Sequence, residues 1–273
     1  MGLSPAPAPG VLADPPSVVW HDLECGAYAA DLSLWHELAM LHPGPVLDVG
    51  AGTGRVALAL ARAGREVTAL ERDGELLAAL GRRAQGLAVE LVHADACSFE
   101  LERRDYALCL VPMQTLQLLG GSARRGEFLR RAQAHLRPGG LLACAVLERV
   151  EPFDCSDGNV GPEPEHVVRG ESRYVSRAIR VQETASSVVI ERERSVLPAR
   201  SPAPAWPFAR QREARIGSRE RNVVELNRVA VATVHEEGQR LGLRPERTRT
   251  IPATDEHVGS SVAMLGRQPE RPR

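Results

Sequence analysis

Three glycines and an acid stand close together in the segment VLDVGAGTGR, residues 46–55. Gly50, Gly52 and Gly54 follow a short apolar run in which Asp48 is the only charged residue. Such a run is typical of a buried strand, and glycines directly after a strand allow a ligand to approach the backbone closely. The segment therefore predicts a site for a nucleotide-like ligand at a strand-to-helix turn.

The spacing of the glycines separates the classes of nucleotide site. A dinucleotide-binding turn follows the pattern G-x-G-x-x-G, but counting from Gly50 places Arg55 at the third glycine position. Counting from Gly52 also fails, because Ala57 stands where the third glycine would be. The chain contains no Lys, which excludes P-loop NTPases and pyridoxal-phosphate enzymes. A nucleotide-dependent oxidoreductase is disfavoured by the spacing.

The composition narrows the function classes further. Hydrophobic residues make up 43% of the chain and charged residues 25%, as in globular proteins with a sizeable core. A net charge of -1 argues against nucleic acid as a partner, because phosphate contacts need a concentrated basic surface. The five scattered cysteines contain no CxxC pair and indicate a reducing cytoplasm, without a disulfide framework or zinc site. No apolar run is long enough to span a membrane.

Short apolar runs alternate with helical patterns between residues 28 and 148. Strands are expected at 45–50, 66–71, 88–95, 106–112 and 140–148, and helices at 28–41, 54–64, 73–84 and 124–136. Near-continuous apolar strands separated by helices specify a parallel sheet covered on both faces. The predicted fold is α/β and Rossmann-like: a doubly wound, mostly parallel seven-stranded sheet with an antiparallel last strand.

The pattern changes after residue 148. Two strand-like segments, 173–182 and 186–197, predict an antiparallel hairpin, and a Pro-rich connection with Trp206 and Phe208 follows. A last helix is expected at 227–241 and two strands at 247–252 and 260–266. The predicted division is a disordered leader (1–17), a Rossmann-like core (18–148), an inserted β cap for substrate (149–226), the C-terminal helix and last two strands of the core (227–266) and a disordered tail (267–273).

The run from Asp48 to Gly54 resembles motif I of the class I S-adenosylmethionine-dependent methyltransferases. In that family the second strand ends in an acid that binds the ribose, and an acidic or polar residue after the third strand lies near the adenine. Glu71 and Asp95 stand at these places, and Pro138-Gly139-Gly140 matches the family's turn before the fifth strand. The resemblance implies S-adenosylmethionine as cofactor. The cofactor-binding residues it implies are Asp48, Gly50, Ala51, Gly52, Gly54, Arg55, Glu71, Arg72, Asp95, Ala96, Val111 and Met113.

Several candidates keep a second interpretation. Asp48 either contacts the ligand or orients the turn, and Asp95 is also a candidate helix N-cap. Tyr28, on a helix expected to fold over the cofactor, belongs to the site or to the core. Gln114 and Gln117 either meet the methionine arm and the acceptor or lie exposed on a short amphipathic helix.

No general base is assigned. None of the eight histidines has an acid at a telling spacing, and His21 and His36, which flank the N-terminal helix, are expected to be structural or solvated. Residues 111–119 lack the Asn/Asp-Pro-Pro-Tyr and Pro-Cys motifs of base-modifying methyltransferases, and they contain no acid for a metal.

The expected function is metal-free, in-line transfer of a methyl group to a small-molecule acceptor. A non-catalytic cofactor- or partner-binding protein that keeps the fold is the main alternative. The acceptor atom and the oligomeric state stay open.

Overall fold

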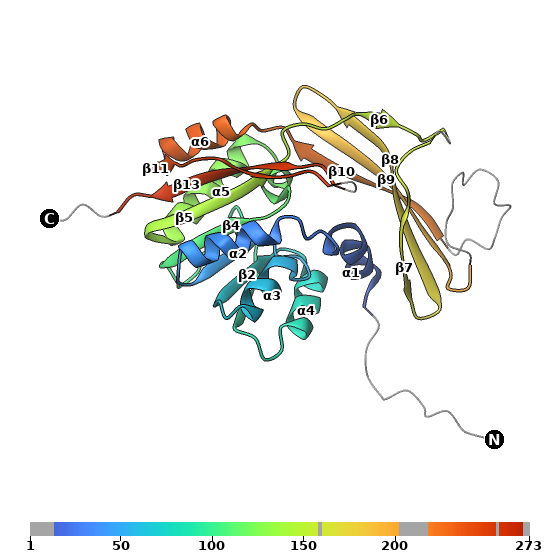
Figure 1. The fold of residues 1–273 in the computed structure, drawn as a ribbon, viewed down its shortest axis with the longest axis horizontal. Helices are drawn as coiled ribbons and strands as arrows, with labels where there is room; N and C mark the ends of the chain where they lie inside the picture. The colour runs from blue at the N-terminus through green and yellow to red at the C-terminus, as the bar shows by residue number, and fades with distance from the viewer. Residues whose placement is uncertain (1–13, 158–159, 202–217, 255–256, 270–273) are drawn as a thin grey trace, which may run out of the picture.

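The computed structural model describes residues 14–157, 160–201, 218–254 and 257–269 (Figure 1). Within these residues the chain forms two β-sheets, and the larger one has eight strands in the order β11-β13-β5-β4-β1-β2-β3, with β12 also paired to β13. The strands are β1 Val46–Val49, β2 Val67–Glu71, β3 Val89–His93, β4 Tyr106–Val111, β5 Leu136–Val146, β11 Leu243–Pro245, β12 Arg249–Ile251 and β13 Ser260–Arg267.

Five neighbouring strands of the sheet, β5, β4, β1, β2 and β3, run parallel, and β13 runs antiparallel to β5. This arrangement confirms the predicted fold class. The sheet has one strand more than expected, because two short strands, β11 and β12, pair with different parts of β13.

Helices cover both faces of this sheet (Figure 1). Side chains from α2 Leu32–Leu41, α3 Arg55–Arg62 and α4 Gly74–Arg83 pack on one face, and side chains from α5 Ser122–His135 and α6 Val231–Arg240 pack on the other. Neighbouring residues of a strand point to opposite faces, so Val46 belongs to the first core and Leu47 to the second. No helix in the described part of the chain is long and apolar enough to cross a membrane.

The chain between β5 and α6 forms a second, antiparallel sheet in the order β10-β9-β8-β6, with β7 also paired to β8. Its strands are β6 Phe153–Asp154, β7 Glu165–Arg169, β8 Ser172–Glu183, β9 Ser187–Pro198 and β10 Ser218–Asn227. The expected hairpin corresponds to β8 and β9, whereas β6, β7 and β10 were not expected. The aromatic residues Trp206 and Phe208 lie outside the described residues.

The N-terminal segment lies between α4 and the second sheet (Figure 1). It consists of α1 Pro16–His21 and the π-helical turn η1 Asp22–Gly26, and it precedes α2. The helix expected from Tyr28 begins only at Leu32, and α1 begins inside the expected leader, of which residues 1–13 lie outside the described part. Val18 and Trp20 are buried, so tertiary packing stabilises this short helix.

Candidate active site

A cavity of about 320 Å³ opens at the carboxyl ends of β1 to β4, the edge at which parallel α/β sheets bind ligands. Its volume lies in the range of roughly 300–1,000 Å³ that is typical of small-molecule sites. The residues expected from the sequence that line it are Asp48, Gly50, Ala51, Arg55, Glu71, Arg72, Asp95, Ala96, Met113 and Gln114. Gly52, Gly54, Val111, Tyr28 and Gln117 were also expected and do not line it.

The glycine turn between β1 and α3 is in close contact with two other segments of the protein. Gly50, Gly52 and Gly54 all have positive φ angles, which favour glycine. A Cβ at Gly50 would lie 2.5 Å from Cγ2 of Thr115, and one at Gly52 would lie 2.5 Å from Nε2 of His21. The turn is therefore closed over by Thr115 and His21, and a side chain at either glycine would displace them.

Glu71, the last residue of β2, presents a pre-oriented carboxylate to the cavity. Its Oε2 accepts the backbone N–H of Gly52 at 2.9 Å, and its Oε1 accepts those of Arg72 and Asp73 at 2.8 and 2.9 Å. A carboxylate has about four acceptor positions, so about one remains for a ligand. Asp73 also caps α4 by accepting the N–H groups of Glu75 and Leu76.

Asp48 is the least satisfied polar group of the cavity wall. Asp48 is 1% exposed, and neither carboxylate oxygen has a donor within hydrogen-bonding geometry among the described residues, the Ala57 N–H lying nearby without forming a full bond. Burial raises the pKa of Asp48 to about 7, against the opposing charge of Arg55 and a weaker pull from the Ala57 N–H. A buried carboxylate of this kind is costly unless a cation pairs with it.

Arg55 lines the cavity, but its charge is already paired. It forms a bidentate ion pair with the fully buried Asp31, with N–O distances of 2.5 and 2.8 Å, and donates to the carbonyl of Tyr28. The Tyr28 ring lies under this guanidinium, 5.1 Å away, and stacks on His257. Tyr28 therefore does not line the cavity itself, but it contacts Arg55, which does. Trp35 completes the cluster by donating to Asp31.

Asp95 stands at the mouth of the cavity, half exposed. Its Oδ1 accepts the backbone N–H of Cys97 at 2.7 Å, so it caps a turn, and no helix follows it. Its Oδ2 pairs at 2.6 Å with Arg124 of α5, which also donates to the carbonyl of Leu119. These bonds hold the pKa of Asp95 below its usual range, the Cys97 N–H having the largest effect, so the acid is ionised at neutral pH.

The two glutamines after β4 lie in different environments. Gln114 lines the cavity beside Met113, whose φ of 53° is the one positive value at a non-glycine residue in the described chain. Gln117, in the 3-10 helix η2 Thr115–Leu119, is fully buried. Its amide exchanges two bonds with the backbone of Leu147 and donates to the carbonyl of Asn227. Gln117 thus connects the end of β5 to the end of β10.

Several cavity residues lie outside the set expected from the sequence, among them His21, Cys25, Thr115 and Arg124. His21 was expected to be structural or solvated, yet it forms part of the wall. The apolar residues 18–20 directly before His21 are buried. This apolar run is the sequence signal from which a packed N-terminal segment could have been expected. No group of three or more His, Cys, Asp or Glu side chains in the described ranges is arranged to hold a metal ion.

The doubly wound sheet, the glycine turn and the acids at the ends of β1 and β2 agree with the resemblance to class I S-adenosylmethionine-dependent methyltransferases. Residues 46–140 match the family model described as "Methyltransferase domain". Residues 46–140 are therefore a methyltransferase domain, in agreement with the resemblance and its implied cofactor. No curated protein matches the chain in sequence.

Solved structures share the fold over nearly the whole chain. One is an S-adenosylmethionine-bound amino pentose methyltransferase from Micromonospora echinaspora, with a TM-score of 0.67, 20% identity and coverage of 92% of this chain and 97% of that one. A sugar N-methyltransferase from Streptoalloteichus has a TM-score of 0.65 at 18% identity and covers 99% of both chains. A 1,6-didemethyltoxoflavin-N1-methyltransferase from Burkholderia thailandensis has a TM-score of 0.55 at 18% identity, with 96% and 94% covered. At these identities the likeness establishes the fold.

Proposed function

We propose that this protein transfers a methyl group from S-adenosylmethionine to an amine nitrogen of a small molecule, by direct displacement without a metal. One observation carries the proposal. The buried carboxylate of Asp48 stands in the cavity wall without a full hydrogen bond or ion pair among the described residues, and the ordered carboxylate of Glu71 lines the same cavity. A ligand with a cationic group and a hydroxyl-bearing sugar matches both acids.

The cavity residues divide between the parts of such a ligand. Asp48 would pair with the ammonium of the methionine arm, an interaction that relieves its unpaired burial. Glu71 would accept a ribose hydroxyl at its remaining position, and Asp95 would lie at the adenine edge. Bound there, S-adenosylmethionine supplies an electrophilic methyl group on a sulfonium.

The chain's own contribution to the reaction is alignment of the acceptor and exclusion of water. Apolar side chains such as Met113 and Leu118 line the cavity. A neutral amine attacks without prior loss of a proton, so the methyl transfer itself needs no general base. The second sheet, which lies beside α1 in Figure 1, is the proposed cap for the acceptor. Similar structures described as an amino pentose methyltransferase, a sugar N-methyltransferase and an N1-methyltransferase support nitrogen as the acceptor atom.

The test combines binding with turnover. Calorimetry with S-adenosylhomocysteine and with NAD asks which nucleotide the purified protein binds, and an amine panel with amino sugars is then incubated with S-adenosylmethionine. The expected result is binding of S-adenosylhomocysteine alone and an acceptor heavier by one methylene group. Binding of NAD in its place would favour an oxidoreductase. Binding without turnover on any acceptor would favour the non-catalytic alternative.

The site of action in the cell belongs to the proposal as well. We infer that the protein works in the cytoplasm, which its five cysteines support, because all of them are free thiols. Fractionation of the source cells with an antibody against the protein would test this, and recovery outside the cytoplasm would contradict it.

A further inference from the structure

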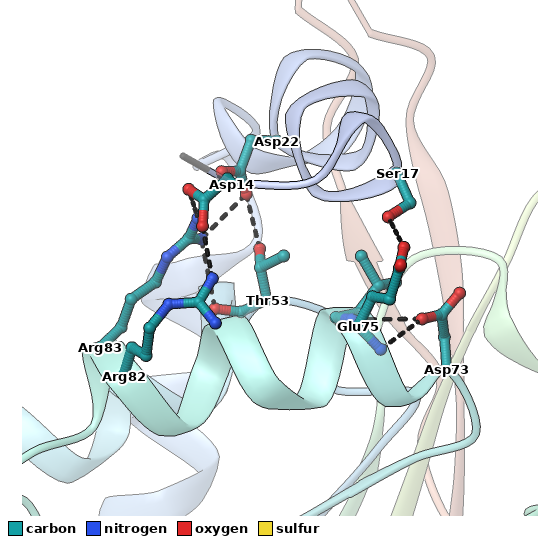
Figure 2. A network of polar contacts seen from close by, with 9 residues as sticks. Asp14, Ser17, Asp22, Thr53, Asp73, Glu75, Arg82 and Arg83 are labelled. Carbon is teal, nitrogen blue, oxygen red and sulfur yellow. Dashed lines mark hydrogen bonds and ion pairs between the residues drawn. The ribbon is translucent and has the colours of Figure 1, made fainter. Parts of the chain in front are cut away.

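The N-terminal wall of the cavity is attached to the glycine turn through Asp22. Thr53, the residue between the last two glycines, donates its hydroxyl to Oδ1 of Asp22 at 2.7 Å. Arg83 of α4 forms a bidentate pair with the same carboxylate, at 2.9 and 2.6 Å. Figure 2 shows Asp22 between Thr53 and Arg83, with further contacts from Asp14 and Ser17 to the same helix. The segment is thus held on α4 at several points.

The same segment is also held on the second sheet. Glu24 pairs with Arg194 of β9 at 2.8 and 2.7 Å and accepts the hydroxyl of Ser176 of β8 at 2.7 Å. The ring of Trp20 meets Tyr174 edge-on, with centroids 5.0 Å apart. Asp22 is therefore held by the core, and Trp20 and Glu24 are held by the second sheet. His21 lies between these contacts and lines the cavity.

The hydrogen-bond pattern around His21 determines which ring nitrogen carries the proton. Nδ1 of His21 lies 3.4 Å from Oγ1 of Thr53. A hydroxyl has one hydrogen, and that of Thr53 goes to Asp22. Nδ1 must therefore be the donor in its contact with Thr53. Burial lowers the pKa of His21, so the ring is neutral at neutral pH and Nε2 carries a free lone pair.

The charge of Glu71, the proposed ribose-binding acid, acts on the same ring. The Nε2 and Cε1 atoms of His21 lie against Gly52, whose N–H is bonded to Oε2 of Glu71. Three backbone N–H groups already occupy Glu71, and a carboxylate has about four acceptor positions. A ribose has two hydroxyl donors, so a second acceptor is needed beside Glu71, and His21 is in the right place and protonation state.

We propose that His21 belongs to the cofactor site: its Nε2 accepts one ribose hydroxyl of S-adenosylmethionine while Glu71 accepts the other. Thr53 and Asp22 are positioning residues that set the His21 tautomer. The inference rests on the proposed cofactor, and it predicts that the N-terminal segment contributes a direct ligand contact in addition to covering the cavity.

The direct test is a cycle between His21 variants and adenosine ligands. Calorimetry measures the affinity of the full-length protein and of His21→Leu for 5′-methylthioadenosine and its 2′-deoxy and 3′-deoxy analogues. The expected loss in His21→Leu is about five- to tenfold for the parent ligand, the scale of one hydrogen bond, and none for the analogue lacking the paired hydroxyl. His21→Gln, which keeps an acceptor, should recover most of the affinity.

Each outcome bears on one claim. A loss in His21→Leu that is equal for all three ligands, or no loss for any, would overturn the role of His21. Failure of the unsubstituted protein to bind S-adenosylhomocysteine would instead overturn the proposed function. Thermal melting of each variant separates these results from misfolding.

The positioning role of Asp22 has its own readout. In Asp22→Ala the Thr53 hydroxyl is released and can donate to Nδ1 of His21, which moves the ring proton to Nε2. Long-range ¹H–¹⁵N spectra of the imidazole should show this change of tautomer, with a five- to tenfold loss of 5′-methylthioadenosine affinity. Arg82→Ala is the matched control, since Arg82 neighbours Arg83 on α4 but contacts Asp14 and not Asp22. An unchanged tautomer in Asp22→Ala would overturn the positioning role.

Discussion

Replacing Asp48 by Asn should stabilise the ligand-free protein at pH 8 and weaken its binding of S-adenosylhomocysteine. Burial raises the pKa of this carboxyl from 3.8 to about 7. The folded state therefore binds the proton more tightly than the unfolded state, and stability is lost as the pH rises from about 4 to about 7. The full difference corresponds to about 4 kcal/mol, at about 1.4 kcal/mol for each tenfold change in proton affinity.

The gain from Asp48→Asn is smaller than this difference, because a buried amide without partners costs about 1–3 kcal/mol itself. We therefore expect about 1–3 kcal/mol of added stability at pH 8. For a chain of this size that raises Tm by roughly 5 °C. The gain should disappear near pH 5, where the folded wild type carries a protonated Asp48. Melting curves of both proteins from pH 5 to 8 measure it, with the exposed Asp105→Asn as control.

Asp48→Asn should have the opposite effect on ligand binding: it should lower the affinity for S-adenosylhomocysteine. Asp48→Asn removes a charge-assisted bond to the ligand ammonium, with an expected affinity loss of tenfold or more. Wild-type affinity should fall below about pH 7, because the ammonium favours the ionised acid. A Tm difference that is independent of pH would refute the burial argument. Unchanged affinity of the variant would refute the ammonium assignment.

Three further predictions concern other parts of the site. Glu71→Ala should weaken S-adenosylhomocysteine binding at least about tenfold, and equal affinity by calorimetry would contradict the ribose role. Arg124→Ala should weaken it a few-fold by releasing Asp95, whereas Arg130→Ala, on the same helix and paired with Glu127, should not. Gln117→Leu should lower the free energy of unfolding, measured in urea, by about 2–4 kcal/mol, because buried backbone groups of the core and second sheet lose their partners. A change below about 0.5 kcal/mol would contradict the role of Gln117 in linking the two sheets.

Many of the residues that line the cofactor cavity could be predicted from local sequence patterns. The strand-end position of Glu71 follows from the apolar run before it, and both Glu71 and Asp48 line the cavity because parallel strands end at one edge. Gln114 and Gln117 show the limit of such reasoning. Both lie in one short amphipathic stretch, and only the distant partners Leu147 and Asn227 distinguish the buried residue from the cavity residue.

The second sheet was predictable only in part. The hairpin β8–β9 has its own alternating pattern, whereas β10 is a charged strand whose pairing depends on β9. Cross-strand ion pairs such as Arg219–Glu193 stabilise this arrangement only after the strands are aligned. The apolar face of β10 is limited to Val224 and Leu226, which pack in a cluster with Val188, so the strand carries only a short period-2 signal of its own.

By itself the sequence determined the doubly wound core and the glycine turn, because hydrophobic periodicity and glycine spacing are local properties of the chain. The cofactor class followed from the resemblance of the turn to a known methyltransferase motif. The tertiary structure alone decided that Asp48 lies unpaired in the cavity wall, that Arg55 is neutralised by Asp31, and that His21 meets Gly52. Burial, proton affinity and tautomer depend on groups that are distant in the chain, and only folding brings those groups together.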